Sequence, residues 1–153
     1  MNDRIWHYTI GNHLPSIIAD GEIKLATAFV WEGRPVVWFS TNPSWEQTAN
    51  KGFFNNDGTF KALSKRQTES LGGGLVRIEV CPEAAPYSWN DFLRMSDTPR
   101  KIAKALAKRA QQVGSAASLW RVSFEAVTRD KWLAIEVLQE DQWIVRAQQK
   151  GTK

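Results

Sequence analysis

The chain has 153 residues, 42% hydrophobic and 24% charged, which is the composition of one globular domain and excludes a disordered chain. Twenty lysines and arginines against sixteen aspartates and glutamates give a formal net charge of +4, which is compatible with a polyanionic partner. No apolar run approaches the ~20 residues of a membrane span, and the lone Cys81 excludes an internal disulfide framework. We therefore expect a single cytoplasmic domain over residues 1–153 with no membrane partner.

Apolar patterning in the first third of the chain predicts a strand over 5–10, a helix over 14–21, an extended piece at 23–25 and a strand over 35–40. The helix has Pro15 near its start, where the missing N–H does no harm, and Gly21 at its left-handed end. Residues 44–50 follow a break in the pattern. We expect a short helix there, capped by Ser44 or Asn42.

The stretch from about 51 to 72 shows the least regular pattern, and we expect a long mobile loop that is partly basic. Its cations are Lys61, Lys65 and Arg66. Three glycines then lead into a predicted strand over 75–80, without the spacing of a phosphate-binding loop.

The clearest helix is predicted over 99–113, with Thr98 as its cap, Pro99 at its start and Gly114 at its end. One face is apolar, and the segment contains no acidic residue. The basic residues of its other face are Arg100, Lys101, Lys104 and Lys108. This pattern favours contact with DNA or RNA, and the alternative is a face that is simply solvated.

Three runs near the C-terminus predict strands over 119–127, 132–138 and 143–146, with a tight turn at Glu140–Asp141. Together the elements indicate an α+β fold with a mostly antiparallel sheet and a few short helices. With only His7 and His13, the chain cannot form a multi-histidine metal site, and we expect no metal. It also lacks the G-x-S-x-G motif of serine hydrolases.

Four motifs remain, in a fixed order from about residue 5 to residue 138. They are Trp6–His7–Tyr8–Thr9, the helix Asn12-x-Leu14-x-x-Ile17-Ile18-x-x-Gly21, the strand Val36–Val37–Trp38–Phe39–Ser40–Thr41 and the late segment Ser123–Phe124–Glu125. In this order they resemble the ADP-ribosyltransferase superfamily, which uses NAD. The resemblance implies a split antiparallel sheet around an NAD-binding cleft.

The same resemblance implies a role for each motif residue. His7 would bond the adenosine-side ribose, the backbone of Tyr8 would hold the nicotinamide amide, and Thr9 would support the pocket. Trp38 would stack on the nicotinamide, on a cofactor-binding strand that includes Phe39 and Ser40. Glu125 would bond the nicotinamide ribose and stabilise the developing cation, or help deprotonate the acceptor, so the expected catalytic residues are Glu125, His7 and Trp38.

Alternatives stay open for several of these residues. His7 could be a structural histidine, Trp38 could belong to the core, and Glu136 is a rival catalytic acid. We prefer Glu125, because strand alternation would direct it and Ser123 into the cleft together. The family's frequent glycine after the histidine is Tyr8 here, and its frequent tyrosine is Trp38.

The expected function is therefore a metal-independent mono-ADP-ribosyltransferase that uses NAD and modifies a nucleic acid. A free-standing enzyme of this size would fit a toxin or defence effector, with an antitoxin or regulatory protein as a possible partner. The alternatives are a non-catalytic nucleotide- or RNA-binding module on the same fold, and an RNA 2′-phosphotransferase-like enzyme.

Overall fold

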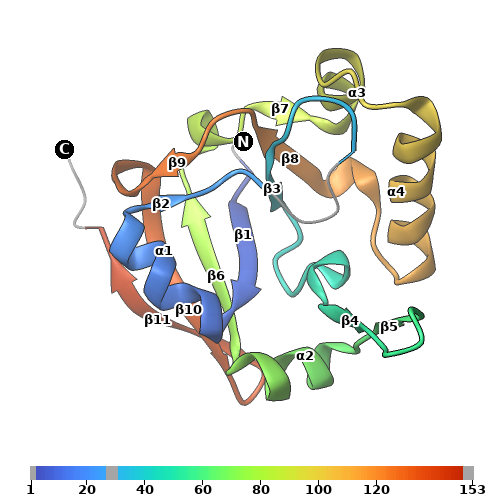
Figure 1. The fold of residues 1–153 in the computed structure, drawn as a ribbon. Coiled ribbons are helices and arrows are strands. Elements are labelled where there is room, and N and C mark those ends of the chain that lie inside the picture. The colour runs from blue at the N-terminus through green and yellow to red at the C-terminus, as the bar shows by residue number, and fades with distance from the viewer. Residues whose placement is uncertain (1–2, 27–30, 150–153) are drawn as a thin grey trace.

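A seven-stranded sheet forms the centre of the molecule, whose computed structural model describes residues 3–26 and 31–149 (Figure 1). The order of its strands is β11-β10-β6-β1-β3-β8-β7, and every recorded pairing is antiparallel. The strands are β1 (Ile5–Ile10), β3 (Val37–Ser40), β6 (Leu75–Val80), β7 (Tyr87–Ser88), β8 (Trp120–Ser123), β10 (Trp132–Gln139) and β11 (Gln142–Gln148). The predicted α+β class with a mostly antiparallel sheet is confirmed.

The sheet is nearly divided between β1 and β3. On one side, β1 pairs with β6 along its whole length, from Ile5 opposite Val80 to Ile10 opposite Leu75. On the other side, β1 pairs with β3 at a single position, Trp6 opposite Ser40. Two blocks of strands, β11-β10-β6-β1 and β3-β8-β7, therefore meet at one pair.

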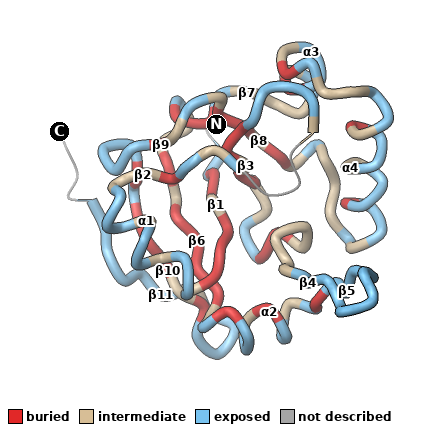
Figure 2. Tube along the Cα trace, in the orientation of Figure 1, coloured by how far each residue is buried: buried red, intermediate tan, exposed pale blue. Residues whose placement is uncertain are grey.

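Each face of the sheet has its own core. On one face, β-branched residues of β1, β3 and β6 pack under the helix α1 (Leu14–Asp20) and a two-stranded sheet of β2 (Glu22–Ile23) and β9 (Val127–Thr128). On the other face, aromatic residues around Trp6 and Tyr8 pack against Trp45 and the partly buried Trp143. Figure 2 shows the buried residues concentrated along β1, β3 and β6.

Residues 51–72 form regular structure instead of the expected loop. They contain a hairpin of β4 (Gly52–Phe54) and β5 (Phe60–Ala62), followed by the helix α2 (Lys65–Gly72). Ser64 caps the start of α2 in a capping box: its hydroxyl accepts from the backbone N–H of Gln67, and its own N–H donates to the side-chain oxygen of Gln67. The strands are only three residues long, which is too short to show an alternating pattern in the sequence.

The late strand predicted over 119–127 is interrupted. The Ser123 hydroxyl donates to the carbonyl of Glu125 (2.6 Å) and accepts from its N–H (3.1 Å), so the backbone turns and β8 ends at Ser123. The chain then resumes as β9, outside the main sheet.

Helix boundaries differ from prediction in three places. The helix α4 spans Arg100–Gln112, and its N-terminal Pro99 has no side-chain cap, so Thr98 does not cap it. The short turn of Gln47–Ala49 is capped by Glu46 and not by Ser44 or Asn42. A helix that was not predicted, α3 (Trp89–Met95), has a capping box made by Ser88 and Asp91. Within residues 3–26 and 31–149, no helix has the length and apolar character to cross a bilayer.

Candidate functional site

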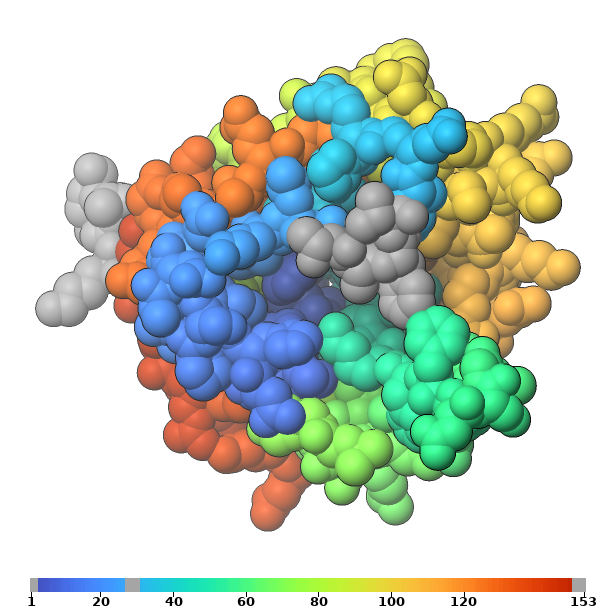
Figure 3. Space-filling view, in the orientation of Figure 1, coloured from blue at the N-terminus to red at the C-terminus, as the bar shows by residue number. Residues whose placement is uncertain are grey.

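A cavity of about 370 Å³ opens where β1 and β3 separate. Its walls come from β1, β3, β8, the segment after β3 and α4. They comprise Trp6, His7, Tyr8, Ala26, Trp38, Phe39, Ser40, Glu46, Thr48, Ala49, Lys51, Leu106, Arg109 and Trp120. Figure 3 shows a hollow in the front of the molecule with dark blue atoms of β1 at its floor. Most of the cofactor-binding residues expected from the sequence lie here.

His7 bridges the gap between the two strands. Its Nδ1 lies 2.8 Å from the main-chain oxygen of Trp38, and because a carbonyl can only accept, Nδ1 is the donor. Burial lowers the pKa of His7 to about 4, so the ring is neutral at pH 7. A neutral ring with its proton on Nδ1 leaves Nε2 as a hydrogen-bond acceptor.

The register also determines where the backbone of Tyr8 points. The N–H of Thr41 donates to Leu119 in the segment before β8 (2.8 Å), so alternate residues of β3, namely Ser40 and Trp38, direct their backbone groups toward β1. Ser40 is paired with Trp6, and the next position would pair Trp38 with Tyr8. The structure records no ladder pair there, and the Trp38 oxygen accepts from His7 instead. The N–H and C=O of Tyr8 therefore face the gap.

The side chain of Tyr8 lies in the opposite core. Its hydroxyl donates to the carbonyl of Asn42 and accepts from Arg77, and its ring packs edge-on against Trp45. Burial raises the pKa of Tyr8 to about 12. Tyr8 thus borders the cavity with its backbone, while its side chain belongs to the opposite core.

Aromatic rings form one wall of the cavity. The ring of Trp38 is half-buried and contacts Phe92 and Trp120, with centroids 4.9 and 5.5 Å apart. Phe39 is buried and meets the ring of His7 edge-on at 5.7 Å. Trp38 is therefore both a core residue and a cavity residue. Thr9 is buried and is not part of the cavity wall; its hydroxyl lies 3.3 Å from Nδ1 of His13.

Glu46 is a carboxylate in the cavity wall that sequence analysis missed. It is buried, and it accepts bonds from the hydroxyl of Ser40 (2.8 Å) and from the N–H and hydroxyl of Thr48 (3.2 and 2.5 Å). Three donors hold the group in one position. In the sequence, Glu46 is marked only by its position shortly after an apolar strand. Carboxylates are common at such positions, so this signal does not identify a functional residue.

Two cations border the same cavity, Lys51 and Arg109. Neither forms an ion pair with a carboxylate in the part of the chain that the structure describes. Burial lowers the pKa of Lys51. The cavity thus combines unpaired positive charge, aromatic surface and one fixed carboxylate.

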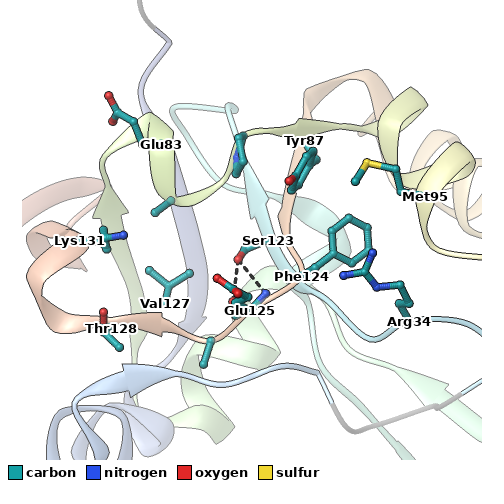
Figure 4. Close-up of a pocket in the computed structure, with 13 residues that line it drawn as sticks. Arg34, Glu83, Tyr87, Met95, Ser123, Phe124, Glu125, Val127, Thr128 and Lys131 are labelled. Carbon is teal, nitrogen blue, oxygen red and sulfur yellow. Dashed lines mark hydrogen bonds between the residues drawn. The ribbon is translucent and has the colours of Figure 1, made fainter.

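Glu125 does not share this cavity, which corrects the expectation that it would face His7 and Trp38. It lines a separate cavity of about 360 Å³ with Ser123, Tyr87 and Arg34 (Figure 4). The turn that ends β8 carries Glu125 away from the sheet, and its side chain is exposed. Strand alternation beyond Ser123 therefore gave the wrong direction for this residue.

Glu136, the alternative catalytic acid, does not line this cavity and forms a buried ion pair. Its carboxylate pairs with Arg77 at 2.7 Å, and both side chains are buried. The Arg77 guanidinium lies close to the rings of Trp6 and Trp143, 4.4 and 4.5 Å from their centroids. This network belongs to the aromatic core on the opposite face of the sheet.

The four basic residues predicted to bind nucleic acid, Arg100, Lys101, Lys104 and Lys108, are all exposed on α4. No group of three or more potential metal ligands occurs among the residues described. Comparisons with family models, with curated proteins and with solved structures find no match to this chain. Its function must therefore be argued from the site.

Proposed function

We propose that the chain is an NAD-dependent mono-ADP-ribosyltransferase that binds the dinucleotide between β1 and β3. One observation carries the proposal. The missing ladder pair leaves a backbone N–H and C=O of one residue, Tyr8, beside an imidazole acceptor and an indole ring. These groups match in kind what the nicotinamide end of NAD offers: a carboxamide, a flat ring and ribose hydroxyls.

A carboxamide needs one donor for its oxygen and one acceptor for its nitrogen. The N–H and C=O of Tyr8 supply both from a rigid strand, and Trp38 supplies a flat surface for the pyridine ring. The side chain of Tyr8 does not take part, because it is held in the opposite core by Arg77 and Trp45.

The rest of the dinucleotide finds complementary groups in the same walls. Nε2 of His7 can accept a bond from a ribose hydroxyl, because Nδ1 already donates to Trp38. Lys51 and Arg109, which form no ion pair within residues 3–26 and 31–149, offer positive charge for the diphosphate. An aromatic and cationic lining of this kind is typical of a nucleotide site.

In the transfer step, the bond between ribose C1′ and the nicotinamide nitrogen breaks, and its electron pair leaves with the nicotinamide. The cationic ribose is then attacked by an oxygen or nitrogen of the acceptor, which loses a proton. A fixed negative charge nearby stabilises the cation. We assign this role to Glu46, the carboxylate in the cavity wall, and we keep Glu125 as the candidate that the family resemblance implies.

The acid-free face of α4 favours a nucleic acid as acceptor. The test is incubation with NAD and measurement of free nicotinamide, with and without single-stranded DNA or RNA. Release above the level of a protein-free control supports the proposal. Binding of NAD without release favours the non-catalytic module, and turnover only with 2′-phosphorylated RNA favours the phosphotransferase.

A further inference from the structure

The β4–β5 hairpin displays three phenylalanines to solvent. Phe53, Phe54 and Phe60 are 44%, 62% and 50% exposed. Phe54 and Phe60 are paired across the two strands, with ring centroids 5.2 Å apart and planes at 67°. Exposed aromatic rings gathered on one short element mark a binding surface more often than a packing accident.

The hairpin is built to hold these rings in place. In the turn, the N–H of Asn55 donates to Thr59 (2.7 Å), and the carboxylate of Asp57 accepts from the N–H and hydroxyl of Thr59. A Cβ at Gly52 would lie 2.2 Å from the ring of Phe60, so the glycine makes room for that ring against the backbone. Because the rings are already held in position, a flat ligand that stacks on them pays a smaller cost in side-chain conformational entropy.

The basic face of α4 adjoins this hairpin. In Figures 1 and 3 the hairpin lies beside the C-terminal end of the helix, where Lys108 and Arg109 are exposed. None of the five α4 cations forms an ion pair within the described part of the chain. Arg109 also borders the cavity, and Lys51 immediately precedes β4. The exposed rings of the hairpin and the cations of α4 therefore lie on neighbouring elements.

We propose that the β4–β5 hairpin and α4 bind a single-stranded nucleic acid, with bases stacked on Phe54 and Phe60 and phosphates on Lys104 and Lys108. The role of this strand as acceptor rests on the proposed function, but its binding does not. A single strand is the occupant because it offers both unpaired base faces and phosphates. A duplex keeps its base faces stacked inside, and a protein partner would have no general need for an acid-free face.

The test is binding of fluorescently labelled single-stranded DNA of about 12 nucleotides, the same sequence as RNA, and the matching duplex, over a series of salt concentrations. Phe54→Leu/Phe60→Leu keeps apolar bulk and removes the stacking faces, so affinity for single strands should fall about tenfold with an unchanged salt slope. Lys101→Glu/Lys104→Glu/Lys108→Glu should reduce both affinity and salt slope. The matched control is Lys24→Glu/Lys131→Glu/Arg146→Glu, which changes the charge equally at sites away from α4 and the hairpin.

Equal affinity for duplex and single strand would overturn the proposal, as would leucine variants that bind like the original chain. Nicotinamide release without acceptor is measured on every variant, because neither set of substitutions alters the groups assigned to NAD. Strand binding without NAD cleavage would leave the surface assignment intact and remove the proposed enzyme. NAD cleavage with a protein, but no nucleic acid, bound at the hairpin would leave the proposed enzyme intact and remove the surface assignment.

Discussion

Nδ1 of His7 donates to the main-chain oxygen of Trp38 at 2.8 Å, in the place where a regular sheet would pair Trp38 with Tyr8. The side chain of His7 thus supplies the hydrogen bond that the Trp38 carbonyl would otherwise receive from a ladder pair. At this position a side-chain hydrogen bond therefore links β1 and β3 in place of a ladder pair.

The first prediction concerns the dependence of stability on pH. The folded pKa of His7 is about 4 and the ordinary value is 6.5, so between these values the unfolded chain binds a proton that the folded chain does not. The free energy of unfolding is therefore unaffected by the titration of His7 above pH 6.5. As pH falls from 6.5 toward 4, it decreases by about 1.4 kcal/mol per pH unit. Urea unfolding of the original chain and of His7→Gln from about pH 4.5 to 7.5 measures it. Parallel curves would contradict the neutral, buried state of His7.

The second prediction concerns the cation at the cavity. Lys51→Met keeps the length of the side chain and removes the charge, so the KM for NAD should rise about tenfold while kcat changes little. The reason is that the diphosphate carries the same charge before and during the reaction. The control is Lys61→Met, which removes an exposed charge from the hairpin. An unchanged KM would remove Lys51 from the site.

The third prediction separates the candidate carboxylates. Glu46→Gln should lower kcat by about 10²–10³-fold with an NAD dissociation constant within a few-fold of the original, because the lost charge acts on the cationic transition state. Glu125→Gln should retain near-normal turnover, since Glu125 lines a different cavity. The reverse result would return the role to Glu125. Full activity in both variants would remove the electrostatic basis of the proposed reaction.

Calorimetry and thermal unfolding accompany these kinetics, because the amide introduced by Glu46→Gln would keep the bond from Ser40 only if its oxygen faces that hydroxyl. A variant that unfolds early is replaced by Glu46→Asp, which keeps the charge and moves it. Loss of turnover with unchanged NAD affinity would then report on position alone.

The fourth prediction concerns the buried ion pair of Arg77 and Glu136. Glu136→Leu should lower the free energy of unfolding by about 3–5 kcal/mol, because it leaves a guanidinium buried without its anion. Arg77→Met/Glu136→Leu should recover part of that loss, since two apolar side chains need no partner. Denaturant titration measures both. Nicotinamide release per folded molecule should be unchanged, which distinguishes this structural carboxylate from a catalytic one.

The strands of the main sheet were the most predictable part of the molecule. Ile5–Ile10 and Leu75–Val80 are rich in bulky apolar residues, largely buried and bounded by turn residues, and the predicted limits agree with the structure. The hairpin at residues 52–62 could not be recognised, because it is held by turn hydrogen bonds and not by an alternating core pattern.

The site was partly predictable for the same physical reason. His7, Tyr8 and Trp38 lie on regular strands, so their positions follow from the fold of the sheet. Glu125 lies beyond the end of a strand, where one serine hydroxyl redirects the backbone. Glu46 and Lys51 lie in the segment after β3 and Arg109 lies on α4, and only tertiary structure brings these two segments to one cavity.

The single pair that joins the two strand blocks also has a consequence for how the chain folds. The chain enters the block of β1, crosses to β3, returns for β6, crosses again for β7 and β8, and returns once more for β10 and β11. Neither block is a continuous segment of the chain, because the strands of one are interrupted in sequence by strands of the other. Loops must close over long separations, such as Ile5 to Val80, before their contacts form, which predicts folding times on the order of milliseconds to seconds. The cavity is lined by β1 from one block and by β3 and β8 from the other, so its walls are complete only after strands of both blocks have met.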